Sequence, residues 1–206
     1  MNTQPKRQIK RRSDLYYMGR ALYWARKAGS CGEVPIGAVV VSPDGEILGR
    51  GYNRRETRQD ISEHAELMAL RQAMRRLGSW RLDGCTLYVS LEPCFMCASA
   101  IQQARIQRVV YAAADPKAGA LGSLVQLFSS FPQNHQPELE AGLLAAEASE
   151  LIRTFFRRRR QENRQLERLL GGRSKRRQLR QQGEIQQSQN QASPEQAAQD
   201  VADSQP

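Results

Sequence analysis

Two short stretches, Ser62-Glu63-His64-Ala65-Glu66 and Leu91-Glu92-Pro93-Cys94-Phe95-Met96-Cys97, are the most informative parts of this chain. They supply one histidine and two cysteines, a set that holds zinc through three protein ligands and leaves the fourth position open. Structural zinc sites are usually closed by four protein ligands, so this set indicates a catalytic metal. Glu66 is a spare carboxylate two residues after His64, and a metal that activates water needs such an acid/base beside it.

Cys94 and Cys97 lie three residues apart at the start of a predicted helix, which places both sulfurs on one side of its first turn. The helix N-terminus and a bound metal both favour the thiolate form. His64 begins another predicted helix and completes the set from a neighbouring element. A Cys-x-x-Cys pair alone is as typical of a redox-active pair, or of two buried cysteines, as it is of a metal site. Glu66 alone is typical of an ordinary surface glutamate. The combination favours metal binding.

The chain has 206 residues, enough for one ordinary domain with an extension. Its best apolar run, 36–41, is strand-sized and too short to span a bilayer. The N-terminus is basic and polar with no apolar stretch after it, which argues against a secretory signal. We therefore expect a cytoplasmic protein with no membrane partner, in which Cys31 and Cys85 are unliganded thiols.

The formal net charge of +10 comes from the two ends of the chain. Residues 1–13 carry five Lys/Arg and no acid, residues 157–206 carry eleven Lys/Arg against six acids, and residues 14–156 carry fifteen of each. A neutral body with basic ends favours arms that hold a polyanion near a site. Basic tails that only aid solubility explain the charge alone equally well.

Hydrophobic periodicity predicts strands that alternate with helices, which is typical of a layered α/β domain. Strands are expected at 35–41, 46–51, 85–90 and 109–111, with a turn at 42–45 that joins the first two as a hairpin. Helices are expected at 14–28, at 64–77, from about 93, and at 138–161. Beyond residue 160 apolar residues thin out, so we expect residues 172–206 to be disordered.

The His-x-Glu and Pro-Cys-x-x-Cys pattern is the signature of zinc-dependent deaminases. The chain closely resembles bacterial tRNA-specific adenosine deaminases, the TadA group of the cytidine/deoxycytidylate deaminase superfamily. The matching stretches are 33–39, 51–54, 64–72, 87–97, 114–120, 134–135 and 155–157, within about residues 14–160. Many cytidine, cytosine and guanine deaminases share the zinc motif. The loop 115–120 and the Phe155-Phe156-Arg157 pattern point to the tRNA branch.

This resemblance implies a three-layer α/β/α cytidine-deaminase-like fold with a five-stranded mixed sheet, usually in a homodimer. It also implies one Zn²⁺ per subunit, held by His64, Cys94 and Cys97. We expect a basic N-terminal arm at 1–13 and a deaminase domain at 14–160. A continued helix and then a Gln/Arg-rich disordered tail are expected at 161–206.

The resemblance further implies that Asn53 reads the flipped base and that the backbone around Ala65 lines the pocket. Other residues would lie along the RNA groove: Asp115, Lys117, Asn134, His135 and Phe156. Each has a simpler explanation from the residues alone. Asn53 is at home in a turn after a strand, His135 is typical of an ordinary loop histidine, and Phe155 and Phe156 fit helix core, with core packing favoured for Phe155.

We expect hydrolytic deamination of the wobble adenosine to inosine in a tRNA anticodon loop. Zinc-bound hydroxide attacks the amine-bearing ring carbon while Glu66 shuttles protons. A splayed loop offers an unstacked base, which lowers the energy of base flipping.

The alternative is a deaminase of a free nucleobase or nucleotide, of cytosine or guanine type, which leaves the basic ends without a purpose. An RNA-binding module with structural zinc predicts no suitable carboxylate, yet Glu66 is present. A riboflavin-pathway deaminase–reductase needs a second catalytic domain, which we do not expect here.

Overall fold

The computed structural model of the chain describes residues 12–130 and 134–169. It divides after Phe155 into a first unit, which contains the sheet, and a second unit, which begins at Phe156. The expected basic arm at 1–13 lies outside the described residues except for its last two positions, and the expected disordered tail at 172–206 lies wholly outside them. None of the described helices has the length and apolar character that a membrane span requires.

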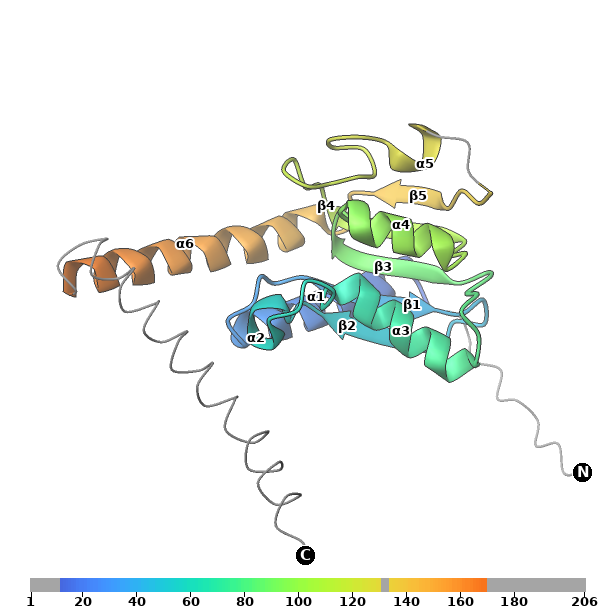
Figure 1. Cartoon of the computed structure of the whole chain (residues 1–206), viewed down its shortest axis with the longest axis horizontal. Helices are drawn as coiled ribbons and strands as arrows, with labels where there is room; N and C mark the ends of the chain where they lie inside the picture. Colours follow the sequence, from blue (N-terminus) through green and yellow to red (C-terminus); the bar gives the residue numbers. More distant parts are fainter. Residues whose placement is uncertain (1–11, 131–133, 170–206) are drawn as a thin grey trace, which may run out of the picture. The chain divides into compact units, whose positions relative to one another are not determined.

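In the described part of the chain, five strands form one mixed sheet in the order β2-β1-β3-β4-β5 (Figure 1). β1 is antiparallel to both neighbours, whereas β3, β4 and β5 run parallel. The predicted hairpin turn is confirmed, since the Gly45 N–H donates to the Ser42 carbonyl at 3.0 Å. The strands are β1 Gly37–Val41, β2 Ile47–Tyr52, β3 Thr86–Leu91, β4 Arg108–Ala113 and β5 Glu138–Ala141.

Among the described residues, four longer helices precede, connect or follow the strands, and two single-turn helices lie in loops. The longer ones are α1 Asp14–Ser30, α3 Ala65–Leu77, α4 Phe95–Gln103 and α6 Ala145–Leu169; the short ones are α2 Arg55–Arg58 and α5 Leu127–Ser130. The start of α1 is fixed by Ser13, whose hydroxyl accepts the Tyr16 N–H at 3.4 Å. α3 ends at Gly78, which adopts the left-handed conformation common after a helix (φ 65°).

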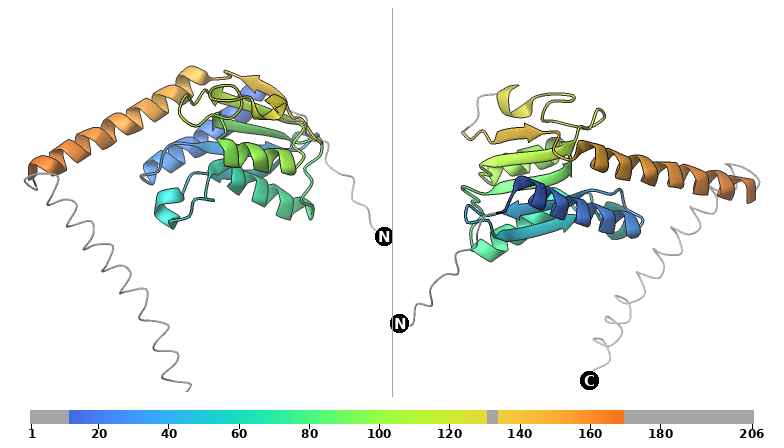
Figure 2. Two further views of the ribbon diagram at one scale, coloured as in Figure 1. Left: turned by 45° about the horizontal axis from the view of Figure 1, so that its top comes forward. Right: turned by 180° about the vertical axis from the view of Figure 1, so that it is seen from behind.

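The alternation of side chains along the strands divides the core into two layers. On one face, α3 and α4 cover a cluster that includes Ala38, Val40, Leu87, Val89 and Val109. On the other face, α1 covers a cluster that includes Val39, Val41, Tyr88, Val110 and Ala112, together with Ala148 from the start of α6. Figure 2 shows α3 and α4 side by side on one face and α1 on the other. The three-layer architecture with a five-stranded sheet is confirmed.

One expectation is wrong: residues 138–141 are strand β5 and not the start of the last helix. Glu-Leu-Glu-Ala contains good helix formers and has no alternating apolar face, so local pattern favours helix. All four residues are exposed or half-buried, and parallel pairing from Arg108↔Glu138 to Tyr111↔Ala141 holds the strand. Arg108 reinforces it through an ion pair with Glu140. Gly142 (φ 93°) and Leu144 (φ 58°) then turn the chain into α6.

The first half of α3 lies directly on two glycines of β2. A methyl group on Gly49 would come within 2.0 Å of the Ala69 carbonyl oxygen, and one on Gly51 within 2.1 Å of the Ala65 carbonyl oxygen. The absent side chains therefore set how closely α3, and with it His64 and Glu66, approaches the sheet.

We predict that Gly51→Ala lowers the free energy of unfolding by about 1–3 kcal/mol, because the added methyl forces the start of α3 away from β2. Urea denaturation measures the change. Gly19→Ala is the matched control, since Gly19 lies inside α1 and its added methyl meets nothing within 4 Å. That control should gain about 0.5–1 kcal/mol from helix propensity. Equal stability of Gly51→Ala and the wild type would contradict the close contact.

Candidate active site

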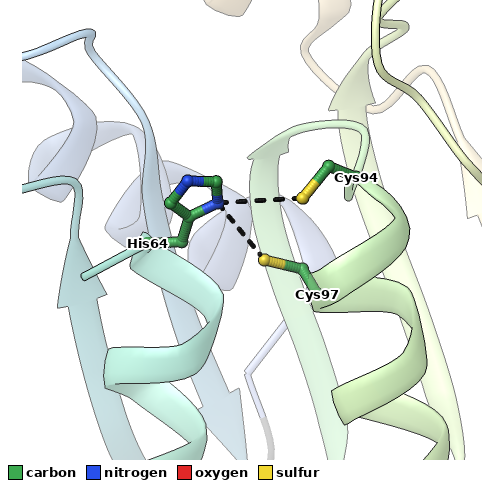
Figure 3. A group of neighbouring side chains, drawn as sticks. All are labelled: His64, Cys94 and Cys97. Atoms are coloured by element: carbon green, nitrogen blue, oxygen red, sulfur yellow. Dashed lines mark hydrogen bonds between the residues drawn. The ribbon is translucent and has the colours of Figure 1, made fainter. Parts of the chain in front are cut away.

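Two helix N-termini on the same face of the sheet bring the three predicted ligands together (Figure 3). His64 is the N-cap residue of α3, Cys94 is the N-cap residue of α4, and Cys97 follows in the first turn of α4. His64 Nδ1 lies 3.8 Å from Cys94 Sγ and 3.5 Å from Cys97 Sγ. All three ligand atoms fall within 4.8 Å of one another.

The spacing of these atoms fits a tetrahedral zinc ion. With Zn–S of about 2.3 Å and Zn–N of about 2.0 Å, two ligand atoms of one tetrahedron lie about 3.5–3.8 Å apart. The two histidine–sulfur distances, 3.8 and 3.5 Å, are close to the nitrogen–sulfur separation of about 3.5 Å at the lower end of that range. Three ligands from the described chain leave the fourth position for water or substrate, as catalytic zinc requires.

The two thiols are electrostatically coupled, as expected for a metal-binding pair. A hydrogen bond from the Cys97 thiol, with a further contribution from His64, lowers the pKa of Cys94 to about 4. The same bond, together with burial, raises the pKa of Cys97. The hydrogen bond to Cys94 also raises the pKa of His64. One thiolate is therefore in place at neutral pH, and a metal that binds Cys97 displaces the proton of that thiol.

Glu66 lies in the first turn of α3 with only 4% of its surface exposed. Burial raises the pKa of this carboxyl to about 6, and its side chain also interacts with the Cys97 thiol. A carboxyl whose pKa lies close to neutral pH accepts a proton from one group and returns it to another with little driving force lost. The structure thus places the predicted acid/base against the ligand set.

Asn53 follows β2 and is positioned by a carboxylate to which sequence analysis gave no role. Its Nδ2 donates to the fully buried Glu33 at 3.2 Å. Glu33 also accepts the Thr57 N–H at 2.6 Å and the Thr57 hydroxyl at 2.8 Å. The carboxylate fixes which end of the Asn53 amide is the donor. No described residue donates a hydrogen bond to Asn53 Oδ1. This oxygen is also not one of the described, fully buried atoms that lack a partner. An acceptor thus remains for a ligand.

Glu92, the second carboxylate that sequence analysis left without a role, shapes the loop 115–123 around Cys94. It accepts the backbone N–H groups of Asp115, Leu121 and Ser123, each at 3.0 Å. Burial alone would raise the pKa of Glu92, but these bonds and one from the Ser123 hydroxyl outweigh it and lower the pKa. Gly119 forms a bridge to Cys94. The loop is therefore built onto the metal centre.

Two of the residues expected along an RNA groove lie on this loop. The Asp115 carboxylate accepts the N–H groups of Lys117 at 2.9 Å and Ala118 at 3.3 Å, so it first of all closes its own turn. The Lys117 side chain is exposed. Ala65, by contrast, is fully buried against the sheet.

Asn134 and His135 lie at the opposite end of α4 from the cysteines. His135 Nε2 donates to the Ile106 carbonyl at 2.6 Å, and the Asn134 carbonyl accepts from Arg105 at 3.0 Å. The nine residues of α4 separate the two ends by roughly 13 Å. The structure does not bring these two residues to the metal ligands. Phe156 is exposed in the second unit, and contact of all three with RNA stays a prediction.

We predict that Cys94→Ala strongly reduces the amount of bound zinc and lowers the melting temperature, because two ligands hold the metal far more weakly than three. Atomic emission of the dialysed protein measures the metal content. Cys31→Ala removes an exposed thiol outside the set and should keep the full amount. A Cys94→Ala protein that retains one zinc would remove Cys94 from the ligand set.

Residues 11–113 match the family model of the cytidine and deoxycytidylate deaminase zinc-binding region. The tRNA-specific adenosine deaminase of Bacillus subtilis is 47% identical over 144 residues, which are 70% of this chain and 89% of that protein. The enzyme of the same name from Agrobacterium fabrum is 48% identical over 145 residues, 70% of this chain and 95% of its own length.

Solved structures of deaminases are also similar to this chain. One from a study of A-to-I editing by tRNA:A34 deaminases superposes with a TM-score of 0.64 at 47% identity, covering 66% of this chain and 98% of the other. The guanine deaminase of Nitrosomonas europaea superposes with a TM-score of 0.59 at 27% identity, covering 69% and 84%. With the His64, Cys94 and Cys97 ligand set in place, the chain belongs to the tRNA-specific adenosine deaminases of the cytidine/deoxycytidylate deaminase family.

Proposed function

We propose that this protein deaminates the wobble adenosine of a tRNA anticodon loop to inosine, releasing ammonia. The observation that carries the proposal is a buried carboxylate, Glu66, beside a three-ligand metal set in a chain 47–48% identical to tRNA-specific adenosine deaminases. The zinc set alone is shared with deaminases of free bases. The identity over most of the domain supports the tRNA substrate.

A zinc ion held by His64, Cys94 and Cys97 would lower the pKa of water toward ~7 and so supply a nucleophile at neutral pH. The chain's own contribution is proton transfer through Glu66. Its carboxylate takes the proton that the nucleophile loses and passes it to the ring nitrogen beside the reacting carbon. It then takes the second proton of the added water from the new C–OH group and gives it to the amine, which leaves as ammonia as the C–N bond breaks and the C=O bond forms. Burial raises the pKa of Glu66 to about 6, which suits a group that must both accept and release protons.

Base recognition is assigned to Asn53. Glu33 fixes its amide so that Oδ1 is free to accept a hydrogen bond. The segment after Asn53 is joined to the residue before His64, since the Arg54 N–H donates to the Glu63 carbonyl at 3.0 Å. The base reader and the metal ligand are therefore held in one local framework.

We also propose one zinc per subunit, a homodimer, a cytoplasmic location and a deaminase domain that extends to residue 160. The tRNA substrate supports the location. Exposed apolar side chains beside the site support a subunit interface there: Phe95 and Met96 on α4, and Leu124 and Val125 on the loop packed against its start.

We predict that Glu66→Gln retains zinc and fold but lowers kcat by about 10²–10⁴-fold or more, because the amide cannot carry the proton. The assay measures inosine in an anticodon stem-loop with adenosine at the wobble position. A stem-loop with guanosine there is the control substrate, and free guanine and cytosine are assayed in parallel. Wild-type activity only on a free base would assign the protein to the alternative class. An active Glu66→Gln enzyme would remove the proposed proton carrier.

We predict that Glu33→Gln lowers kcat/KM by about 10- to 100-fold, because a hydrogen bond to a buried charged group contributes about 1.5–3 kcal/mol. Glu33 is a positioning residue, so its effect should pass through Asn53. The double variant Glu33→Gln/Asn53→Ala should therefore be no slower than Asn53→Ala alone. Thr57→Val, which removes only one of the other donors to Glu33, is the control. Additive losses in the double variant would contradict the assignment.

A further inference from the structure

A surface outside the metal site combines three cations with three aromatic rings. It consists of residues from α1 and from strand β2, and we call it the α1–β2 surface: Arg20, Tyr23, Trp24, Lys27, Arg50 and Tyr52. Trp24 and Tyr52 stack in parallel, with ring centroids 5.8 Å apart and planes 10° apart. The stacked pair joins the helix to the edge strand of the sheet.

Each of the three cations lies over a ring of this surface. Lys27 Nζ is 5.1 Å from the Trp24 centroid and 5.3 Å from that of Tyr52. Arg50 lies 5.6 Å from the Trp24 centroid, and Arg20 lies 5.0 Å from that of Tyr23. A cation over an aromatic face is held in place without losing its charge. The rings thus hold the cations in place, and the N–H groups of the cations remain available to a ligand.

These three cations have no carboxylate partner among the described residues. Neighbouring arginines differ, because Arg54 pairs with Glu63 and Arg76 with Glu46. An uncompensated cluster of ordered cations repels itself and is stabilised by an anion from outside the chain. The surface therefore fits a polyanion better than a neutral or basic partner.

Side chains of α3 already form hydrogen bonds with backbone groups on the outer edge of β2. The Arg50 N–H donates to the Gln72 side chain at 2.7 Å, and the Ile47 carbonyl accepts from Arg76 at 3.0 Å. A further strand added to this edge of the sheet would need both of these backbone groups for its own hydrogen bonds. Recognition here must come from side chains. A hollow of about 120 Å³ lies among them, lined by residues that include Arg20, Trp24, Arg50 and Arg76.

The α1–β2 surface lies next to the proposed base-reading residue along the chain. Tyr52 directly precedes Asn53, and Arg50 lies three residues, or roughly 10 Å, along the same strand. An RNA whose reacting base sits at Asn53 would carry its neighbouring phosphates over this strand.

We propose that the α1–β2 surface binds backbone phosphates of the substrate RNA that flank the deaminated nucleotide. This inference rests on the proposed function, and it adds a second contact region of stated chemistry. Arginine suits it because the guanidinium stacks on a ring through its face and bonds phosphate through its edge. Each ring already faces one of the protein's own cations, so we assign the contact to phosphate.

The test is binding of a fluorescently labelled anticodon stem-loop by Lys27→Gln/Arg50→Gln across a series of salt concentrations. Binding should weaken by about 10-fold near 0.1 M salt. The slope of log K against log salt should fall by about 1.4–1.8, because two phosphate contacts are lost. Arg26→Gln/Arg75→Gln is the matched control: it removes the same net charge from exposed cations of α1 and α3 outside the surface. It should change both quantities much less.

Measuring binding in a Glu66→Gln background keeps the outcome separate from turnover. If the wild type makes no inosine, the proposed function fails while the binding result remains interpretable. Trp24 adds a direct probe, since the chain has two tryptophans and Trp80→Phe leaves Trp24 as the only indole. Its emission should change when the stem-loop binds.

Three results would overturn the proposal. Unchanged affinity and salt slope in Lys27→Gln/Arg50→Gln would show that the two cations do not touch phosphate. A loss equal to that of the control would show an effect of net charge alone. A changed sedimentation coefficient of the variant without RNA would identify the surface as a contact between copies of the chain.

Discussion

The ligand atoms of a tetrahedral zinc ion must lie within about 4 Å of one another. In this chain they come from two separate helices, and much of the first unit holds these helices in place. His64 and Cys94 each occupy the N-cap position of a helix, so their positions depend on where α3 and α4 start and how closely these helices lie on the sheet. Gly49 and Gly51 allow α3 to contact β2 directly. The alternating core residues of β1 and β3 form the floor under both helices.

Buried carboxylates then fix the loops around this centre. An ionised carboxylate in a protein interior is costly unless donors surround it, and Glu33, Glu63 and Glu92 are each surrounded. Glu33 takes up the donors of Asn53 and Thr57, Glu63 pairs with Arg54 and Arg71, and Glu92 gathers three backbone N–H groups of one loop. Such groups add little to net stability but are strongly destabilising when a partner is removed. Their contribution is a single loop conformation, which a positioned base reader requires.

The grouping of His64, Cys94 and Cys97 was predictable because their residue types and spacing are typical of metal sites. The central strands were predictable because they are β-branched and buried. The final strand was not, because Glu138-Leu139-Glu140-Ala141 has a local preference for helix and is held by pairing with β4. Glu33 and Glu92 were missed for a related reason. A glutamate has the same sequence signature whether it faces water or lies buried among donors supplied by distant residues. Only the folded chain distinguishes the two.

The same limit applies to charge. Residues 14–156 carry equal numbers of basic and acidic side chains, which argued for a neutral body with basic ends. In the folded chain two of these acids are used internally, because Glu33 and Glu92 accept hydrogen bonds from uncharged backbone and side-chain donors. The cations left over are therefore not balanced locally, and Arg20, Lys27 and Arg50 are ordered by aromatic rings instead of carboxylates. Because a ring orients a cation without neutralising it, a formally neutral domain presents a positively charged surface that a residue count does not reveal.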